Sequence, residues 1–195
     1  TTKRSTTRYW NRTITGTVNY NKTFGDHDLG VLLGTEQYYW NVKGFNATRT
    51  GLLDLSLPDF TAAMDLLEPT VGGTAQQDYG VISYFGRLNY DYQGKYLLSG
   101  VFRYDGYSSL LGDNRWGFFP GVSAGWIFGK EDFIKNAVPD LSFGKLRFSY
   151  GVNGNATGIG AYTLQGSYNS QKYNGNVGYL IGALPNPGLK WEKTR

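Results

Sequence analysis

The stretch NYDYQGKYLLSGVFRYDG, residues 89–106, contains two runs of alternating side chains that meet at Gln93-Gly94. Its even-numbered positions are uncharged and mostly apolar or aromatic, whereas its odd-numbered positions hold all of the charge outside the turn. Because successive side chains of a β-strand point to opposite faces, this period of two predicts a hairpin with one uncharged face and one polar face. The uncharged face is covered either by a protein core or by lipid, and the rest of the sequence bears on that choice.

The composition favours many strands separated by turns, because 28 of the 195 residues are glycine and 16 are tyrosine. The chain has no cysteine, which excludes disulfides and thiolate metal sites, and its net charge of +4 includes no basic block of the kind that binds nucleic acid. No apolar run approaches the ~20 residues of a spanning helix, so this sequence would cross a membrane only as a barrel. The ends, TTKRSTTRYW and WEKTR, lack an initiator methionine and a signal peptide, and we expect the chain to be part of a larger protein.

The alternation predicts strands over residues 9–24, 29–41, 80–92, 95–105, 115–128 and 144–153. Residues 43–78 show no sustained period, and we expect a long irregular loop there. In the last four strands one row of side chains carries no charge: Ile82, Tyr84, Gly86, Leu88, Tyr90, Tyr92, Tyr96, Leu98, Gly100, Phe102, Tyr104, Trp116, Phe118, Pro120, Val122, Ala124, Trp126, Phe128, Leu146, Phe148, Tyr150 and Val152. The charged residues of these strands all fall on the opposite row.

Strand length and aromatic placement favour lipid over a protein core. Trp116 and Trp126 are ten residues apart, roughly 33 Å of strand, which a tilt of ~40° reduces to about 25 Å of height, matching the apolar band between two aromatic girdles. Short turns at 24–28 and 93–94 alternate with longer connections at 43–78, 106–114 and 154–188, as in outer-membrane barrels with short periplasmic turns and long external loops. The exception is the longer inner-side connection at 129–141, which we expect to hold a helical turn. We therefore expect an all-β fold, a segment of a large antiparallel transmembrane β-barrel with about six strands plus the start of a seventh and long extracellular loops. The alternative is a soluble carbohydrate-binding β-sandwich.

Several blocks of sequence resemble the SusC/RagA family of TonB-linked outer-membrane transporters from Bacteroidetes. These blocks, which follow the family's order along nearly the whole chain, are NKTFGDHDLGVLLGTEQ (21–37), SYFGRLNYDYQGKYLLSGVFRYDGYSS (83–109), RWGFFPGVSAGWIFGKEDF (115–133), LRFSYGVNGN (146–155) and NPGLKWEKT (186–194). One departure from the family's pattern follows Asp105-Gly106, where the usual Ser-Ser and Arg-Phe are replaced by Tyr-Ser-Ser-Leu-Leu.

The resemblance implies a plugged barrel of the about 22-stranded transporter type, located in the outer membrane, that imports a glycan or a peptide with energy supplied through TonB. It also implies a SusD-like surface lipoprotein as a lid, contact with membrane lipid and lipopolysaccharide, and no enzymatic activity, cofactor or nucleic-acid partner. We expect residues 1–195 to form part of the barrel, with the plug domain and the TonB box outside this segment. A passive porin or structural barrel is the alternative, and the sequence does not name the solute.

Two groups of residues are candidates for function. We expect the barrel lumen or the plug to be faced by Arg87, Asp91, Arg103, Asp105, Lys145 and Arg147, with the carboxylates, joined by Glu36, pairing with the arginines across strands. Contacts to the ligand or the lid are expected from the exposed aromatic residues of the loops, Trp40, Phe45, Phe60, Tyr162, Tyr168 and Tyr173. His27 is the only histidine, so it has no second histidine for a metal site or catalytic triad, and we expect an exposed turn residue.

Overall fold

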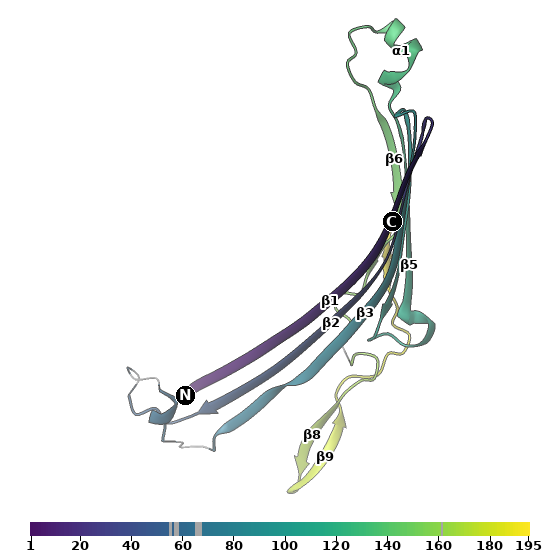
Figure 1. Cartoon of the computed structure of the whole chain (residues 1–195). Helices are drawn as coiled ribbons and strands as arrows, with labels where there is room; N and C mark the ends of the chain where they lie inside the picture. The colour runs from purple at the N-terminus through teal and green to yellow at the C-terminus, as the bar shows by residue number, and fades with distance from the viewer. Residues whose placement is uncertain (55, 57–58, 65–67, 161) are drawn as a thin grey trace. The chain divides into compact units, whose positions relative to one another are not determined.

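The computed structural model describes residues 1–54, 56, 59–64, 68–160 and 162–195, with the backbone alone at 74–76. Strands account for most of the chain, and Figure 1 shows them coloured by residue number. The long strands are β1 (Thr2–Phe24), β2 (His27–Arg49), β3 (Thr70–Tyr92), β4 (Tyr96–Tyr107), β5 (Trp116–Trp126) and β6 (Leu146–Gly151). The short elements are η1 (Phe60–Ala62), η2 (Gly112–Arg115), η3 (Phe128–Lys130), α1 (Asp132–Ala137), β7 (Asn153–Asn155), β8 (Tyr168–Tyr173), β9 (Asn176–Ile181) and β10 (Glu192–Thr194).

The six long strands form one sheet in chain order, from β1 to β6. The pairs β3–β4, β4–β5 and β5–β6 are antiparallel. Near the end of the chain β10 pairs with β7, which follows β6, so the start of a seventh strand is present as expected. Two compact units are distinguished, a first unit of Thr1–Arg12 with Tyr38–Gly80 and a second unit of Thr13–Gln37 with Val81–Arg195.

The register of the second unit confirms the predicted uncharged row. From β3 to β6 an even-numbered residue always lies opposite an even-numbered one, as along the line Tyr90, Leu98, Ala124 and Phe148. No bulge shifts this pairing, so the even-numbered residues that it pairs lie on one side, the uncharged face, and the odd-numbered ones lie on the other, the charged face. The uncharged rows predicted for the individual strands therefore lie on the same side of the sheet from β3 to β6. Phe128, in η3, and Val152, after β6, lie outside the strands, so the predicted row is too long at these two ends.

The β-sandwich alternative requires a second sheet over the uncharged face, and the described residues form none there. Apart from the six-stranded sheet, the described residues form only two-stranded sheets. Leu98, Phe102 and Phe148 are 53%, 40% and 67% exposed. A row of this size left open to the surroundings is typical of a lipid-facing surface and not of a soluble sandwich.

Aromatic side chains form a continuous row where the connections after β1 and β3 are tight turns, here called the turn end. Ring centroids lie 5.3 Å apart for Phe24 and His27, 4.8 Å for His27 and Tyr92, and 6.2 Å for Tyr92 and Tyr96. Trp126 lies opposite Tyr96 in the register and continues the row on β5. At the other end of the strands, the loop end, Tyr104 stacks on Trp116 at 4.8 Å. The uncharged face thus carries aromatic residues at both ends, as the sequence predicts.

The long strands extend well past their predicted ends in the first unit. The expected irregular loop over 43–78 is wrong at both of its ends, because β2 continues to Arg49 and β3 begins at Thr70. Between them Arg49 donates to the carbonyl oxygens of Phe60 and Ala63, at 3.0 and 2.9 Å, and ties the connection to the end of β2. The expected loop over 154–188 likewise contains a hairpin, formed by β8 and β9 (Figure 1). The helical turn expected within 129–141 is confirmed as α1.

Tight packing is found at the loop end, around Leu110 and Phe119, which are 0% and 7% exposed. The indole of Trp191 lies edge-on to the Phe119 ring, with centroids 5.3 Å apart, and its nitrogen donates to the carbonyl oxygen of Arg115 at 2.9 Å. These contacts join the start of β10 to β5 and to the connection before it. Across the described residues, no helix has the length and apolar character needed to span a membrane.

Candidate functional site on the charged face

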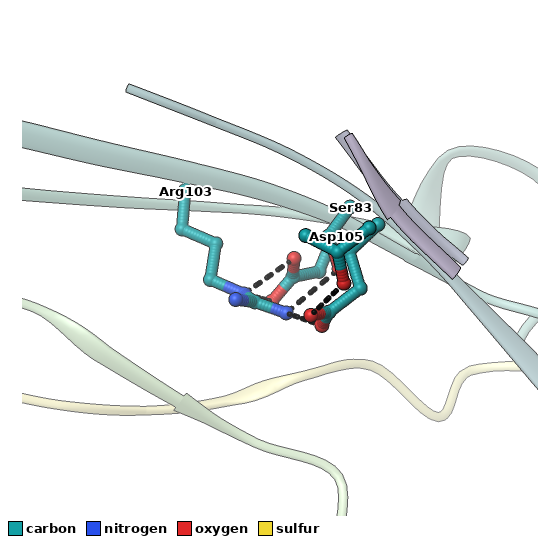
Figure 2. A network of polar contacts seen from close by, with 5 residues as sticks. Ser83, Arg103 and Asp105 are labelled. Carbon is teal, nitrogen blue, oxygen red and sulfur yellow. Dashed lines mark hydrogen bonds and ion pairs between the residues drawn. The ribbon is translucent and has the colours of Figure 1, made fainter. Parts of the chain in front are cut away.

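Arg103, in β4, is the centre of a polar cluster on the charged face (Figure 2). Its Nε donates to both carboxylate oxygens of Asp105, at 2.9 Å each, and its Nη2 donates to Ser83 Oγ at 2.8 Å and to Glu36 Oε1 at 3.2 Å. Three strands, β2, β3 and β4, are therefore joined by one guanidinium. The sequence predicts ion pairs across neighbouring strands. Arg103 does pair with Asp105 and Glu36, but Asp105 lies on β4 itself and Glu36 lies two strands away on β2, so the predicted geometry is wrong.

Aromatic rings flank this cluster in the same row of the sheet. Phe85 and Phe119 lie opposite Arg103 on the two neighbouring strands, and the guanidinium carbon is 5.8 Å from the centroid of the Phe85 ring. Each ring covers a glycine, Phe85 at Gly34 and Phe119 at Gly154, where a Cβ would overlap the ring. The glycines therefore leave room for the rings to lie on the sheet, and these phenylalanines are neighbours of Arg103 that the sequence does not indicate.

The other charged candidates differ from Arg103 in their partners. Asp91 lies at the turn end, where its carboxylate accepts a 2.6 Å hydrogen bond from the backbone N–H of Gly94 and so holds the tight turn between β3 and β4. Arg87, Lys145 and Arg147 form no ion pair with any residue that the structure describes. Arg87 and Arg147 border a hollow of about 560 Å³, and its lining includes small side chains of the charged face, Ser99, Gly121, Ser123, Ser149 and Gly151.

The candidate aromatic residues of the first unit lie mainly on strands. Trp40 and Phe45 are both in β2, so the expected loop position of both residues is wrong. The Trp40 ring contacts Tyr79 at 5.2 Å and Tyr9 at 6.4 Å between centroids. Phe60 lies in η1, with the Arg49 guanidinium carbon 5.6 Å from its ring centroid. Trp40 and Phe60 are half-buried, whereas Phe45 is exposed.

In the second unit the three candidate tyrosines are exposed. Tyr168 and Tyr173 are the first and last residues of β8, and Tyr162 lies in the connection before that strand. The described residues contain no cluster of three or more His, Cys, Asp or Glu side chains placed to hold a metal ion.

His27 is not the exposed turn residue expected from the sequence, because it is half-buried in the aromatic row of the turn end. It is the first residue of β2, and its Nδ1 lies 2.7 Å from the hydroxyl oxygen of Tyr90. The neighbouring strands were not identifiable from the turn sequence GDHD alone, so the cover that they give His27 was not predictable.

Glu131, which precedes α1, closes the turn end with three hydrogen bonds that the sequence did not indicate. Its carboxylate accepts from Tyr96 Oη at 2.6 Å, from Trp126 Nε1 at 3.1 Å and from Lys95 Nζ at 3.3 Å. The hydrogen bond from Tyr96, followed by those from Trp126 and Lys95, holds the pKa of Glu131 below its ordinary value of 4.5. Tyr96 and Trp126 both belong to the uncharged face, so this connection is fastened to the end of that face.

Replacing Glu131 by glutamine should lower the thermal midpoint at neutral pH, because the amide is a weaker acceptor for three donors. A carboxylate whose pKa is lowered on folding stabilises the native state above its unfolded pKa, and this contribution is lost as the pH falls through the lower folded value. The difference in midpoint between the native protein and Glu131→Gln should therefore shrink below about pH 4.5. Asp132→Asn is the matched control, since that side chain is exposed and makes only a 3.8 Å contact with Lys135. A difference that stays constant between pH 7 and pH 3 would contradict the assignment.

Comparison with known proteins assigns the chain to a family. A family model described as TonB dependent receptor-like, beta-barrel matches residues 1–195. The chain belongs to this family. It is 33% identical to the TonB-dependent receptor SusC of Bacteroides thetaiotaomicron over 189 residues, which are 91% of this chain and 18% of that protein. It is 34% identical over 202 residues to the TonB-dependent receptor P26 of Formosa agariphila, covering 96% of this chain and 19% of that protein.

Solved structures agree with the sequence relatives. A structure of the RagAB peptide transporter superposes with a TM-score of 0.81 at 25% identity, covering 98% of this chain and 21% of that one. This TonB-dependent receptor chain thus spans about a fifth of the length of its relatives. The SusC/RagA resemblance, the antiparallel β-barrel fold class and the outer-membrane location of the family are confirmed, and the family is one of receptors and transporters rather than enzymes.

Proposed function

We propose that the whole protein imports a glycan or a peptide across the outer membrane with energy supplied through TonB, and that this chain forms part of its barrel. The observation that carries the proposal is the division of one sheet into two faces. The uncharged face, with aromatic rows at both ends, contacts lipid, and the charged face contacts the plug and the wet path of the solute. Membership of the family and the similarity to SusC and to the RagAB peptide transporter support this assignment.

The residues of the charged face divide into two roles. Arg103 and Asp105 are satisfied within the sheet and hold β2, β3 and β4 together. Arg87, Lys145 and Arg147 have no ion-pair partner within the described part of the chain, and these cations contact the plug or the solute. Asp91 remains at the rim of this surface as a residue of the turn. The plug and the TonB box belong to other segments of the protein.

The exposed aromatic residues toward the loop end are the contacts proposed for the solute or for a SusD-like lipoprotein lid. Phe45, Tyr162, Tyr168 and Tyr173 are the most accessible of them, and flat exposed rings bind sugar rings or apolar peptide side chains. Trp40 and Phe60 are partly covered by neighbours of their own unit, which leaves a smaller area for a ligand.

Uptake measured with and without energy coupling separates active import from the alternative of a passive porin. Cells that carry the full-length protein should take up a labelled glycan or peptide, and deletion of TonB or a protonophore should abolish that uptake. Uptake that persists without TonB would overturn the proposal in favour of a passive pore.

Charge reversal at Arg103 or Arg147 should impair uptake or assembly more than a change at a threonine on the same face. Thr15 is a poor control, because its hydroxyl donates to Glu36 at 3.1 Å and it is therefore part of the Arg103 cluster. Thr17→Val on the same strand is the better comparison, and equal transport by Arg147→Glu and Thr17→Val would exclude a lumen role for Arg147.

A further inference from the structure

The connection between β5 and β6 differs from the other connections at the turn end. Residues 25–26 and 93–95 suffice for the turns after β1 and β3, whereas residues 127–145 form η3, α1 and an irregular return to β6 (Figure 1). Nothing in the sheet geometry requires this length, because two antiparallel neighbours are joined by a turn of two residues elsewhere in the same sheet. The length of residues 127–145 therefore reflects a role other than joining β5 to β6.

The start of α1 is fixed at the end of the uncharged face. Glu131 accepts hydrogen bonds from the polar atoms of Tyr96 and Trp126, two neighbouring side chains in the aromatic row. The Trp126 ring also lies edge-on to Phe128, with centroids 5.8 Å apart. Aromatic residues at such a row place their polar atoms at the level of the lipid headgroups. The carboxylate of Glu131 therefore lies at that level, and α1 begins there.

The rest of the connection combines exposed apolar side chains with lysines. Phe133, Val138 and Phe143 are 61%, 50% and 63% exposed, a concentration that water alone does not favour. Lys130 and Lys135 are exposed in the same segment, and their long side chains can place an ammonium group among phosphates while the stem stays in an apolar layer. Large apolar residues next to lysines at the edge of a lipid-facing surface are typical of segments that lie in the membrane interface.

We propose that residues 127–145 are a membrane-interface anchor, whose Phe133, Val138 and Phe143 enter the boundary between headgroups and acyl chains of the inner-leaflet phospholipids. The inner leaflet is assigned because short turns mark the periplasmic end of outer-membrane barrels. The inference rests on the lipid contact proposed above for the uncharged face, with which this segment is continuous through Glu131, and it does not depend on import. The anchor fixes the height of β5 and β6 relative to the bilayer.

Fluorescence quenching by brominated phospholipids tests the anchor in the full-length protein reconstituted in nanodiscs. Phe133→Cys and, as a second position, Phe143→Cys would be labelled with bimane, in a background without other reactive cysteines; this chain contributes none. Asp132→Cys is the matched control, because its carboxylate side chain is 87% exposed and lies about 100° around α1 from Phe133. Insertion of the apolar side chains by roughly 5–10 Å should quench the labels at 133 and 143 at least about twofold more than the label at 132.

Two further positions separate the failure of this inference from the failure of the proposal on which it rests. Leu98→Cys lies on the uncharged face and Ser99→Cys on the charged face. If Leu98→Cys is quenched and both 133 and 143 are quenched no more than 132, the anchor is overturned while the lipid-facing surface stands. If Leu98→Cys is quenched no more than Ser99→Cys, the lipid-facing surface itself is wrong, and the anchor falls with it.

Discussion

Replacing Phe119 by alanine should lower the free energy of unfolding by about 3–5 kcal/mol, the range for truncating a buried aromatic side chain. The ring is 7% exposed, packs edge-on against Trp191 and covers Gly154. Its removal leaves a cavity lined by glycine, which has no side chain that can move into the space. Unfolding of the full-length protein in urea, followed by tryptophan fluorescence in lipid vesicles, measures the change.

Phe118→Ala is the matched control, because the neighbouring residue has the same side chain on the opposite face of β5. Phe118 is half exposed on the uncharged face, where acyl chains can fill the space that the ring vacates. No cavity forms there, so the loss should be less than half of that at Phe119. Equal losses at the two positions would mean that Phe119 is not packed between β5 and the start of β10.

The faces of the sheet were predictable from the sequence because the signal repeats at every second residue. A charge on the uncharged face is costly in lipid, so Arg87, Asp91, Arg103 and Asp105 are all confined to the odd-numbered row. The antiparallel register then pairs odd with odd and even with even across β3 to β6, which extends the pattern of one strand to the next. The alternation of charged and uncharged side chains therefore reveals which face of each strand is which.

The ends of the strands were not predictable, because the constraint weakens toward the loop end. In the first unit Asn41, Lys43 and Asn46 lie close together in β2, and polar side chains therefore occur on both faces of the strand there. Gly72-Gly73 reads as a turn, yet it lies near the start of β3, since the hydrogen bonds of a strand do not need side chains. Backbone pairing therefore continues where the alternation of side chains no longer reveals it.

The candidate site was predictable in its charges and not in its contacts. Charged residues on one face were identified by parity, but the partner of each depends on the register and on rotamers. Asp91 accepts a hydrogen bond from the backbone of Gly94 in the adjacent turn, whereas Glu36 forms an ion pair with Arg103 two strands away. Phe85 lies on the charged face but is itself uncharged, so neither charge nor loop position identifies it from the sequence. Its position opposite Arg103 was fixed only by the pairing of β3 with β4.

Replacing Arg103 by methionine should cost about 2 kcal/mol of stability, because the carboxylates of Asp105 and Glu36 then lose their common cation. Removing one partner of a fully buried ion pair costs about 3–5 kcal/mol, and the Arg103 side chain is 44% exposed, so water offsets part of that loss. Asp105 is the more affected partner, since its own side chain is only 11% exposed and both of its oxygens bind the same guanidinium nitrogen. Urea unfolding in lipid vesicles gives the change.

A double-mutant cycle of Arg103→Met with Asp105→Asn distinguishes the ion pair from the packing of the arginine stem against Phe85. If the pair carries the loss, Asp105→Asn should be much less harmful once Arg103 is absent, with a coupling energy of about 1–2 kcal/mol. If the stem carries it, methionine should preserve stability and the two substitutions should add independently. A coupling near zero would therefore show that Arg103 contributes through its apolar stem and not by joining β2, β3 and β4 through charge.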